Sequence, residues 1–102
     1  MSEPKIIGGE DWIEVLSHEP NEDYEWSRID VYYSPSARRY FWASDSGCSC
    51  NYFDATHARD FFYGDREAAC RAVREFCTED YYSTDSDTVD CVSTIKTFKE
   101  PK

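Results

Sequence analysis

Strand-forming residues are concentrated between positions 24 and 44, in two segments separated by a turn. Residues 24–33 are rich in aromatic and β-branched side chains, and residues 39–44 carry three aromatic residues in succession. The connection over 34–37 contains Pro35, which cannot donate a hydrogen bond to a neighbouring strand. The pattern predicts an antiparallel hairpin.

A first strand is predicted over residues 12–17, where Trp, Ile, Val and Leu surround a single glutamate. Successive side chains of a strand point to opposite faces of the sheet, so the hairpin has aromatic residues on both faces. One face is expected to bear Tyr24, Trp26, Arg28, Tyr32, Tyr40 and Trp42. This face either binds a partner or forms core beneath a helix, and the pattern is compatible with both.

Two segments of the C-terminal half have helical patterns. Residues 65–77 have apolar side chains at i, i+4, i+7 and i+8 starting from Ala69, and Asp65 is a suitable N-cap. Residues 88–98 place apolar residues at every third position between an Asp/Ser-rich start and a Lys-rich end, which favours a helix. Many of these residues are β-branched, so the alternative is a strand.

These elements predict one α+β domain over residues 1–102, a three-stranded antiparallel meander packed by one or two helices. Residues 1–10 are expected to form a flexible N-terminal lead. Residues 45–51 are all small or polar and are expected to form a loop, and residues 57–61 a short helical turn.

Composition narrows the classes of partner. The chain has 21 acidic and 11 basic residues and a net charge of −10, which disfavours direct nucleic-acid binding because phosphate contacts need a basic footprint. No run approaches the roughly 18 apolar residues of a membrane span. Acidic stretches over 10–30 and 65–90 can engage a basic surface of another protein, or serve solubility alone. The acidic contact residues expected from the first stretch are Glu22, Asp23 and Glu25.

Five cysteines form an odd set, and the N-terminus has no secretory pattern. We therefore expect a reducing, cytoplasmic setting with free or metal-bound thiols. Cys48 and Cys50 with His57 form a candidate zinc site, to which a further cysteine would contribute the fourth ligand. The alternative is that the cysteines are simply reduced, and buried as small apolar side chains. Apart from this possible zinc, no cofactor is expected.

Catalytic motifs are missing from the sequence. It has no nucleophile elbow, phosphate-binding loop, dinucleotide-type glycine pattern or HExxH motif. We therefore predict that the chain is not an enzyme. A small hydrolase or nuclease would need a cleft that joins Asp45, His57 and a cysteine.

One segment carries a family resemblance. Residues 42–50 read Trp-Ala-Ser-Asp-Ser-Gly-Cys-Ser-Cys, after a tyrosine-rich strand and before Phe53-Asp54. The chain resembles a family of small uncharacterised proteins encoded by actinobacteriophages and their hosts. That resemblance implies a phage setting and no catalytic residues. From the residues themselves, Asp45 and Ser46 are suited to shape a turn that presents the segment for recognition.

The sequence thus predicts a phage-encoded, small acidic accessory protein that binds a host protein, possibly one that handles nucleic acid. An inhibitor of host-takeover or anti-defence type fits this description, acting in the host cytoplasm as a monomer or small homo-oligomer. The alternative is a zinc-stabilised structural or interaction module that uses Cys48, Cys50 and His57.

Overall fold

The structure is a computed structural model, and it describes residues 8–20, 25–48, 57–79 and 83–101. Side chains within the second and third strands are described over 27–34 and 39–45. The elements, in chain order, are β1 (Ile13–His18), β2 (Glu25–Ser34), β3 (Arg39–Cys48), the 3₁₀ turn η1 (Ala58–Asp60), β4 (Phe62–Gly64), α1 (Arg66–Glu79) and α2 (Asp85–Thr97).

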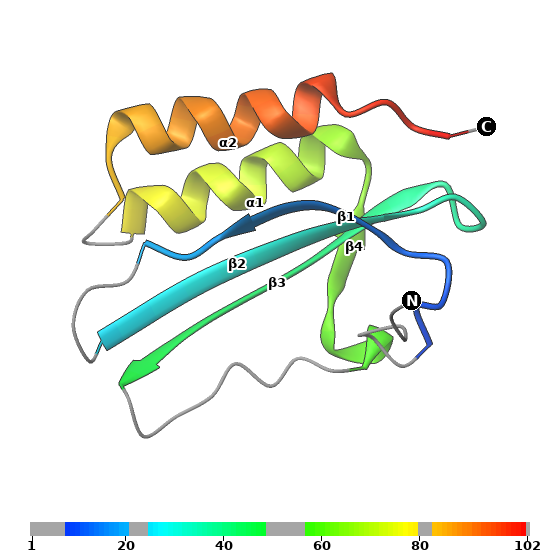
Figure 1. Cartoon of the computed structure of the whole chain (residues 1–102), viewed down its shortest axis with the longest axis horizontal. Coiled ribbons are helices and arrows are strands. Elements are labelled where there is room, and N and C mark those ends of the chain that lie inside the picture. Colours follow the sequence, from blue (N-terminus) through cyan, green and yellow to red (C-terminus); the bar gives the residue numbers. More distant parts are fainter. Residues whose placement is uncertain (1–7, 21–24, 49–56, 80–82, 102) are drawn as a thin grey trace, which may run out of the picture.

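The α+β class is confirmed, but the sheet has four strands and not three. Its order is β1-β2-β3-β4, and each neighbouring pair is antiparallel. The predicted meander missed β4 because three residues are too few for an alternating pattern to stand out from the mixed aromatic and charged residues around them. Both helices lie side by side over one face of this sheet (Figure 1).

The pairing register decides which aromatic residues share a face. Tyr33 lies opposite Tyr40, whereas Tyr32 lies opposite Phe41. Residues directly opposite in an antiparallel pair project from the same face, so Tyr40 faces the helices and Tyr32 faces away from them. The expectation that Tyr32, Tyr40 and Trp42 share one face is therefore wrong.

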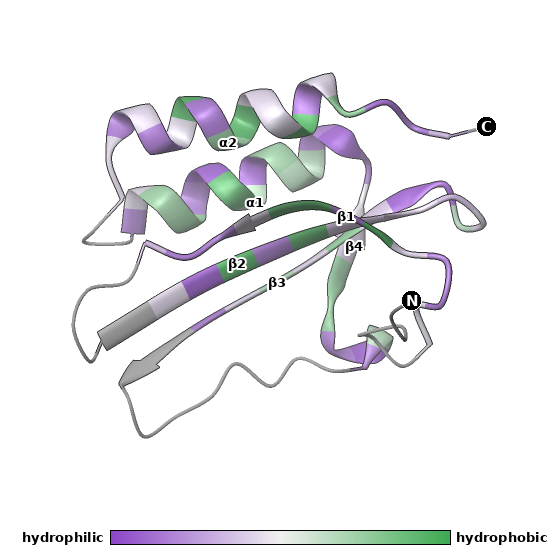
Figure 2. Cartoon of the chain, in the orientation of Figure 1, coloured by the Kyte–Doolittle hydropathy of each residue, from purple (hydrophilic) through white to green (hydrophobic). Residues whose placement is uncertain are grey.

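The main core lies between the sheet and the helix pair. Apolar residues in the middle of β2 meet apolar stripes of both helices (Figure 2). The i, i+4, i+8 spacing of Ala69, Val73 and Cys77 places one side of α1 on the sheet, as the helical pattern predicted. The buried members of this core are Ile29, Val31, Tyr33, Tyr40, Ala69, Cys70, Val73, Cys77, Cys91, Val92 and Ile95.

A smaller aromatic core covers the opposite face of the sheet. The Trp12 ring stacks on Phe41 at 4.3 Å between centroids, and Phe61 meets Trp12 edge-on at 5.1 Å. Gly9 permits this packing, because a Cβ atom there would lie 2.6 Å from the Trp12 ring. The turn before β1 and the segment around η1 therefore replace a helix layer on this side.

Local signals account for the helix boundaries. The Asp65 carboxylate accepts a hydrogen bond from the Ala68 amide at 2.8 Å and caps α1, as predicted. Thr84 and Asp87 form a reciprocal capping box at the start of α2, which confirms a helix in place of the alternative strand.

The connections between elements were predicted less well. The short helical turn expected over 57–61 is confirmed as η1. The loop expected over 45–51 is wrong for residues 45–48, because β3 continues to Cys48 in register with Glu25. Pairing with β2 satisfies the backbone of these small polar residues, which have little strand preference of their own. Residues 49–51 lie outside the described part of the chain.

The core position with the clearest expected cost is Ile95, whose side chain is fully buried under the sheet. We predict that Ile95→Ala lowers the free energy of unfolding by about 2–5 kcal/mol, because it leaves a cavity. Val89, in the same helix, is 65% exposed, and Val89→Ala should change stability by less than about 0.5 kcal/mol. Urea denaturation measures both; equal effects would contradict the packing described.

Candidate functional site

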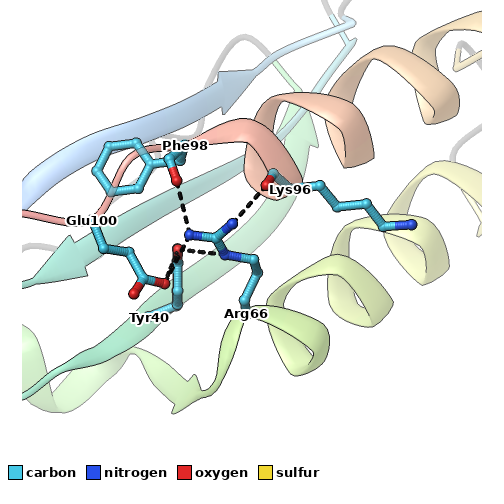
Figure 3. A network of polar contacts seen from close by, with 5 residues as sticks. All are labelled: Tyr40, Arg66, Lys96, Phe98 and Glu100. Atoms are coloured by element: carbon cyan, nitrogen blue, oxygen red, sulfur yellow. Dashed lines mark hydrogen bonds and ion pairs between the residues drawn. The ribbon is translucent and has the colours of Figure 1, made fainter.

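One polar network joins the N-terminus of α1 to the C-terminus of α2 (Figure 3). The Arg66 guanidinium donates to the backbone carbonyls of Lys96 at 2.6 Å and Phe98 at 2.8 Å. It also donates to the Glu100 carboxylate at 2.9 Å and to the Tyr40 hydroxyl at 3.0 Å. These carbonyls belong to the end of a helix, where backbone acceptors lack partners within the helix. Arg66 thus fastens the C-terminal segment to the sheet.

The same network shifts two pKa values. Burial and the hydrogen bond to Glu100 raise the pKa of Tyr40 to about 12, so this hydroxyl stays protonated near neutral pH. Its donation to Glu100 at 2.7 Å, together with Arg66, lowers the pKa of that carboxyl. Because these groups bind one another, the network is structural. We call Tyr40, Arg66 and Glu100, with the Lys96 and Phe98 carbonyls, the clamp.

Arg28, predicted as a contact residue on an aromatic face, is held by its own strand. Its guanidinium forms a two-point ion pair with Asp30, with both nitrogen–oxygen distances at 3.0 Å. Asp30 is buried and also accepts from the Ser17 hydroxyl at 2.8 Å. This pairing raises the pKa of Arg28. Arg28 therefore compensates a buried charge.

The other predicted contact residues are dispersed. Tyr32 and Tyr40 are buried on opposite faces, and Trp42 is partly buried beside the helices. Asp45 is exposed in β3, opposite Arg28. The remaining candidates lie outside the described residues or have side chains that are not described: Glu22, Asp23, Tyr24, Glu25, Trp26 and Ser46.

Among the described residues, the most exposed aromatic side chains lie on β4, which the sequence pattern did not assign. Phe62 is 70% exposed and Tyr63 is 61% exposed. Phe62 pairs with Trp42 and so projects from the helix face, whereas Tyr63 pairs with Phe41 on the other face. The run of aromatic residues from Phe61 to Tyr63 was the available signal, but it is too short to distinguish a strand from a loop.

A groove of about 620 Å³ lies beside this strand. Its sheet side is formed by Trp42, Phe61, Phe62 and Tyr63, and its helix side by Ala68, Arg71, Ala72 and Glu75 of α1. β4 ends the sheet, and among the described residues no further strand pairs with its outer edge. We call this surface, Trp42 and Phe61–Tyr63 with the facing residues of α1, the β4 groove.

A second group of reactive side chains lies toward the other end of the helix pair, away from Arg66. His18 at the end of β1 meets Cys77 of α1 and Cys91 of α2, with one ligand atom from each within 4.8 Å of the others. The Ser83 hydroxyl hydrogen-bonds His18 Nε2 at 3.1 Å, and the Phe76 ring packs edge-on against the imidazole. We call His18, Cys77 and Cys91 the thiol–imidazole cluster.

The Cys91 thiol of this cluster is protonated near neutral pH. Burial, and the neighbouring Cys77, raise the pKa of Cys91 to about 12. Burial also raises the pKa of Cys70, which lies nearby in α1. Since the thiolate is the nucleophilic form, Cys91 lacks the lowered pKa of a catalytic cysteine.

The zinc site predicted from Cys48, Cys50 and His57 cannot be located, because Cys50 and the Cys48 side chain lie outside the described part of the structure. His57 caps η1 and contacts Asp60 at 3.8 Å. Among the described residues, it is instead His18 that lies with two cysteines. Chain spacing could not reveal this, because the three residues come from three separate elements.

The fold and these surfaces define a small α+β domain with a four-stranded antiparallel sheet, a two-helix layer and an aromatic edge strand. Residues 10–100 match the family described as a domain of unknown function, DUF7574, and the chain belongs to that family. This confirms the expected membership of an uncharacterised domain family. No match was found among curated proteins or among solved structures. Neither α1 nor α2, the helices of the described residues, is long and apolar enough to cross a membrane.

The clamp predicts a specific pH dependence of stability. Because the pKa of Glu100 is lowered in the folded state, its carboxylate stabilises the fold above its ordinary value of 4.5. That contribution is lost as the pH falls through the lower folded-state value. We expect the stability difference between wild type and Glu100→Gln to shrink between about pH 5 and pH 3 in urea titrations.

The exposed Glu79, at the other end of α1, provides the matched control. Glu79→Gln should differ little from wild type across this pH range. A Glu100→Gln variant whose stability parallels that of wild type from neutral to acidic pH would show that the carboxylate does not contribute to the clamp.

Proposed function

We propose that this protein acts by binding a partner protein in the β4 groove, without catalysis. The single observation that carries the proposal is the exposure of Phe62, at 70%, on the helix face of β4, where the other described sheet aromatics, Tyr33, Tyr40 and Trp42, are buried or partly buried. Aromatic side chains supply much of the binding energy at protein interfaces. A partner that covers the Phe62 ring would bury aromatic surface that the described part of the chain leaves exposed.

The groove favours an extended segment as the occupant. β4 offers a strand edge, and α1 forms the facing wall, where the small side chains of Ala68 and Ala72 leave room for inserted side chains. Addition of a strand to a sheet edge, with alternate side chains held by neighbouring pockets, is a common mode of peptide recognition. The bound segment would place one apolar side chain against Trp42 and Phe62.

Charge supports a basic partner. The chain carries a net charge of −10, which attracts positively charged proteins over a long range and accelerates their association. The groove itself has one base and one acid on its helix side, Arg71 and Glu75. Net charge would therefore steer the partner, while the apolar groove would select the segment that binds.

The finer part of the proposal rests on the resemblance described above. The resemblance implies a phage-encoded accessory factor that acts in the host cytoplasm. Its partner would be a host protein that this factor inhibits. A host protein with a basic, nucleic-acid-binding surface matches the charge argument, because such a surface is complementary to an acidic domain.

Selection from a random peptide library displayed on phage tests this proposal. We expect enriched peptides with apolar residues at alternate positions and flanking basic residues. Isothermal titration should give an affinity that falls on the order of 10-fold or more in Phe62→Ser, because an interface aromatic residue contributes about 1–2 kcal/mol or more.

Val89→Ser is the matched control, since Val89 is a similarly exposed apolar residue of α2 that does not line the β4 groove. Its affinity should stay within about twofold of wild type. The proposal fails if Phe62→Ser and Val89→Ser bind the selected peptides equally well, or if amide chemical-shift changes on binding cluster away from residues 62–64 and 68–75.

A further inference from the structure

We propose that the thiol–imidazole cluster, His18, Cys77 and Cys91, binds a zinc ion. This site differs from the one indicated by the sequence, and it does not depend on the proposed partner. Its three ligand atoms lie within 4.8 Å of one another. The residues come from β1, α1 and α2, so a bound ion would connect the sheet edge to both helices.

The distances are close to those that zinc needs. Zinc–sulfur and zinc–nitrogen bonds of about 2.3 and 2.0 Å in a tetrahedral site place neighbouring ligand atoms about 3.5–3.8 Å apart. Atoms within 4.8 Å of one another therefore need to approach by at most about 1.0–1.3 Å. Side-chain rotation can supply a movement of that size without moving a helix.

The donor set selects the metal. Two thiolates and one imidazole are soft to intermediate ligands, which favour Zn²⁺ over Mg²⁺ or Ca²⁺. Cys77 and Cys91 are buried, whereas His18 is only partly buried, so a water molecule can reach the fourth position of the tetrahedron. The Ser83 hydroxyl and the Phe76 ring hold the imidazole in place, as groups around metal-bound histidines commonly do.

Cys70 provides a comparison within this protein, because it is a buried cysteine whose role is packing alone. It is buried in the same helix as Cys77, and its thiol contacts the Val92 carbonyl at 4.0 Å. It is not a member of the cluster. Cys77 and Cys91 differ from it because an imidazole from another layer of the fold meets both of them.

Cobalt titration of the full chain tests the site. The protein is reduced and freed of metal with a chelator, and Co²⁺ is then added without oxygen. We expect about one Co²⁺ per chain, thiolate-to-cobalt charge-transfer absorption, and the visible bands of a tetrahedral ion. Zn²⁺ should displace the cobalt and raise the thermal midpoint of unfolding, because it binds the folded state.

Variants distinguish this site from the alternatives. Cys77→Ser and His18→Asn should each lose the tetrahedral cobalt spectrum, whereas Cys70→Ser and the double variant Cys48→Ser/Cys50→Ser should retain it. Circular dichroism of His18→Asn, which leaves the buried thiols unchanged, separates loss of binding from loss of folding.

Three outcomes would overturn the inference. One is a folded, reduced wild type that takes up less than about 0.2 equivalents of Co²⁺ and of Zn²⁺. Another is a cobalt spectrum that disappears in the Cys48→Ser/Cys50→Ser variant and persists in Cys77→Ser, since the metal would then lie at the sequence-predicted site. The third is a Cys77–Cys91 disulfide that forms in air, combined with a reduced protein that takes up no metal, since the two thiols would then pair with each other and bind no ion.

Discussion

The guanidinium of Arg66 fixes the antiparallel helix pair to the sheet. It stands at the first residue of α1 and donates to two carbonyls at the end of α2, to Glu100 and to the Tyr40 hydroxyl. A planar group with several donors in fixed directions can hold such a set, whereas a lysine ammonium could not reproduce its geometry. One side chain thereby connects the sheet with both helices.

Both candidate functional surfaces follow from where the helix pair lies. At the end of the pair away from Arg66, Cys77 and Cys91 meet His18 of the first strand. On the other side, α1 packs on β3 and β4 but leaves Phe62 exposed beyond it. The pair thus completes a ligand cluster at one edge and leaves a binding groove at the other, and the two surfaces are structurally independent.

The elements that local chemistry specifies could be predicted from the sequence. Asp65 caps α1, and the acidic start and Lys-rich end of α2 agree with its helix. The relation between strands could not be predicted in this way. Alternation gives the two faces of each strand but not their pairing, and a one-residue change of register exchanges the faces. Tyr32 and Tyr40 were placed together for this reason.

β4 and the thiol–imidazole cluster could not be predicted from the sequence because both depend on long-range contacts. β4 is held by pairing with β3 and by its groove neighbours in α1, and its three residues carry no pattern of their own. The cluster needs His18 from near the start of the chain and two cysteines from separate helices. Sequence spacing favoured Cys48, Cys50 and His57 because they are close in the chain, although ligands of a metal site need only be close in space.

The central claim is that the helix pair docks in one position, which brings Tyr40 to Phe98 at one end and His18 to Cys77 and Cys91 at the other. Nuclear Overhauser spectroscopy of the metal-free protein measures both ends together. The account predicts cross-peaks from the Tyr40 ring to the Phe98 ring, whose centroids lie 6.3 Å apart, and from the His18 ring to the Cys77 and Cys91 β-protons. A folded protein with the first set of cross-peaks and without the second would contradict it.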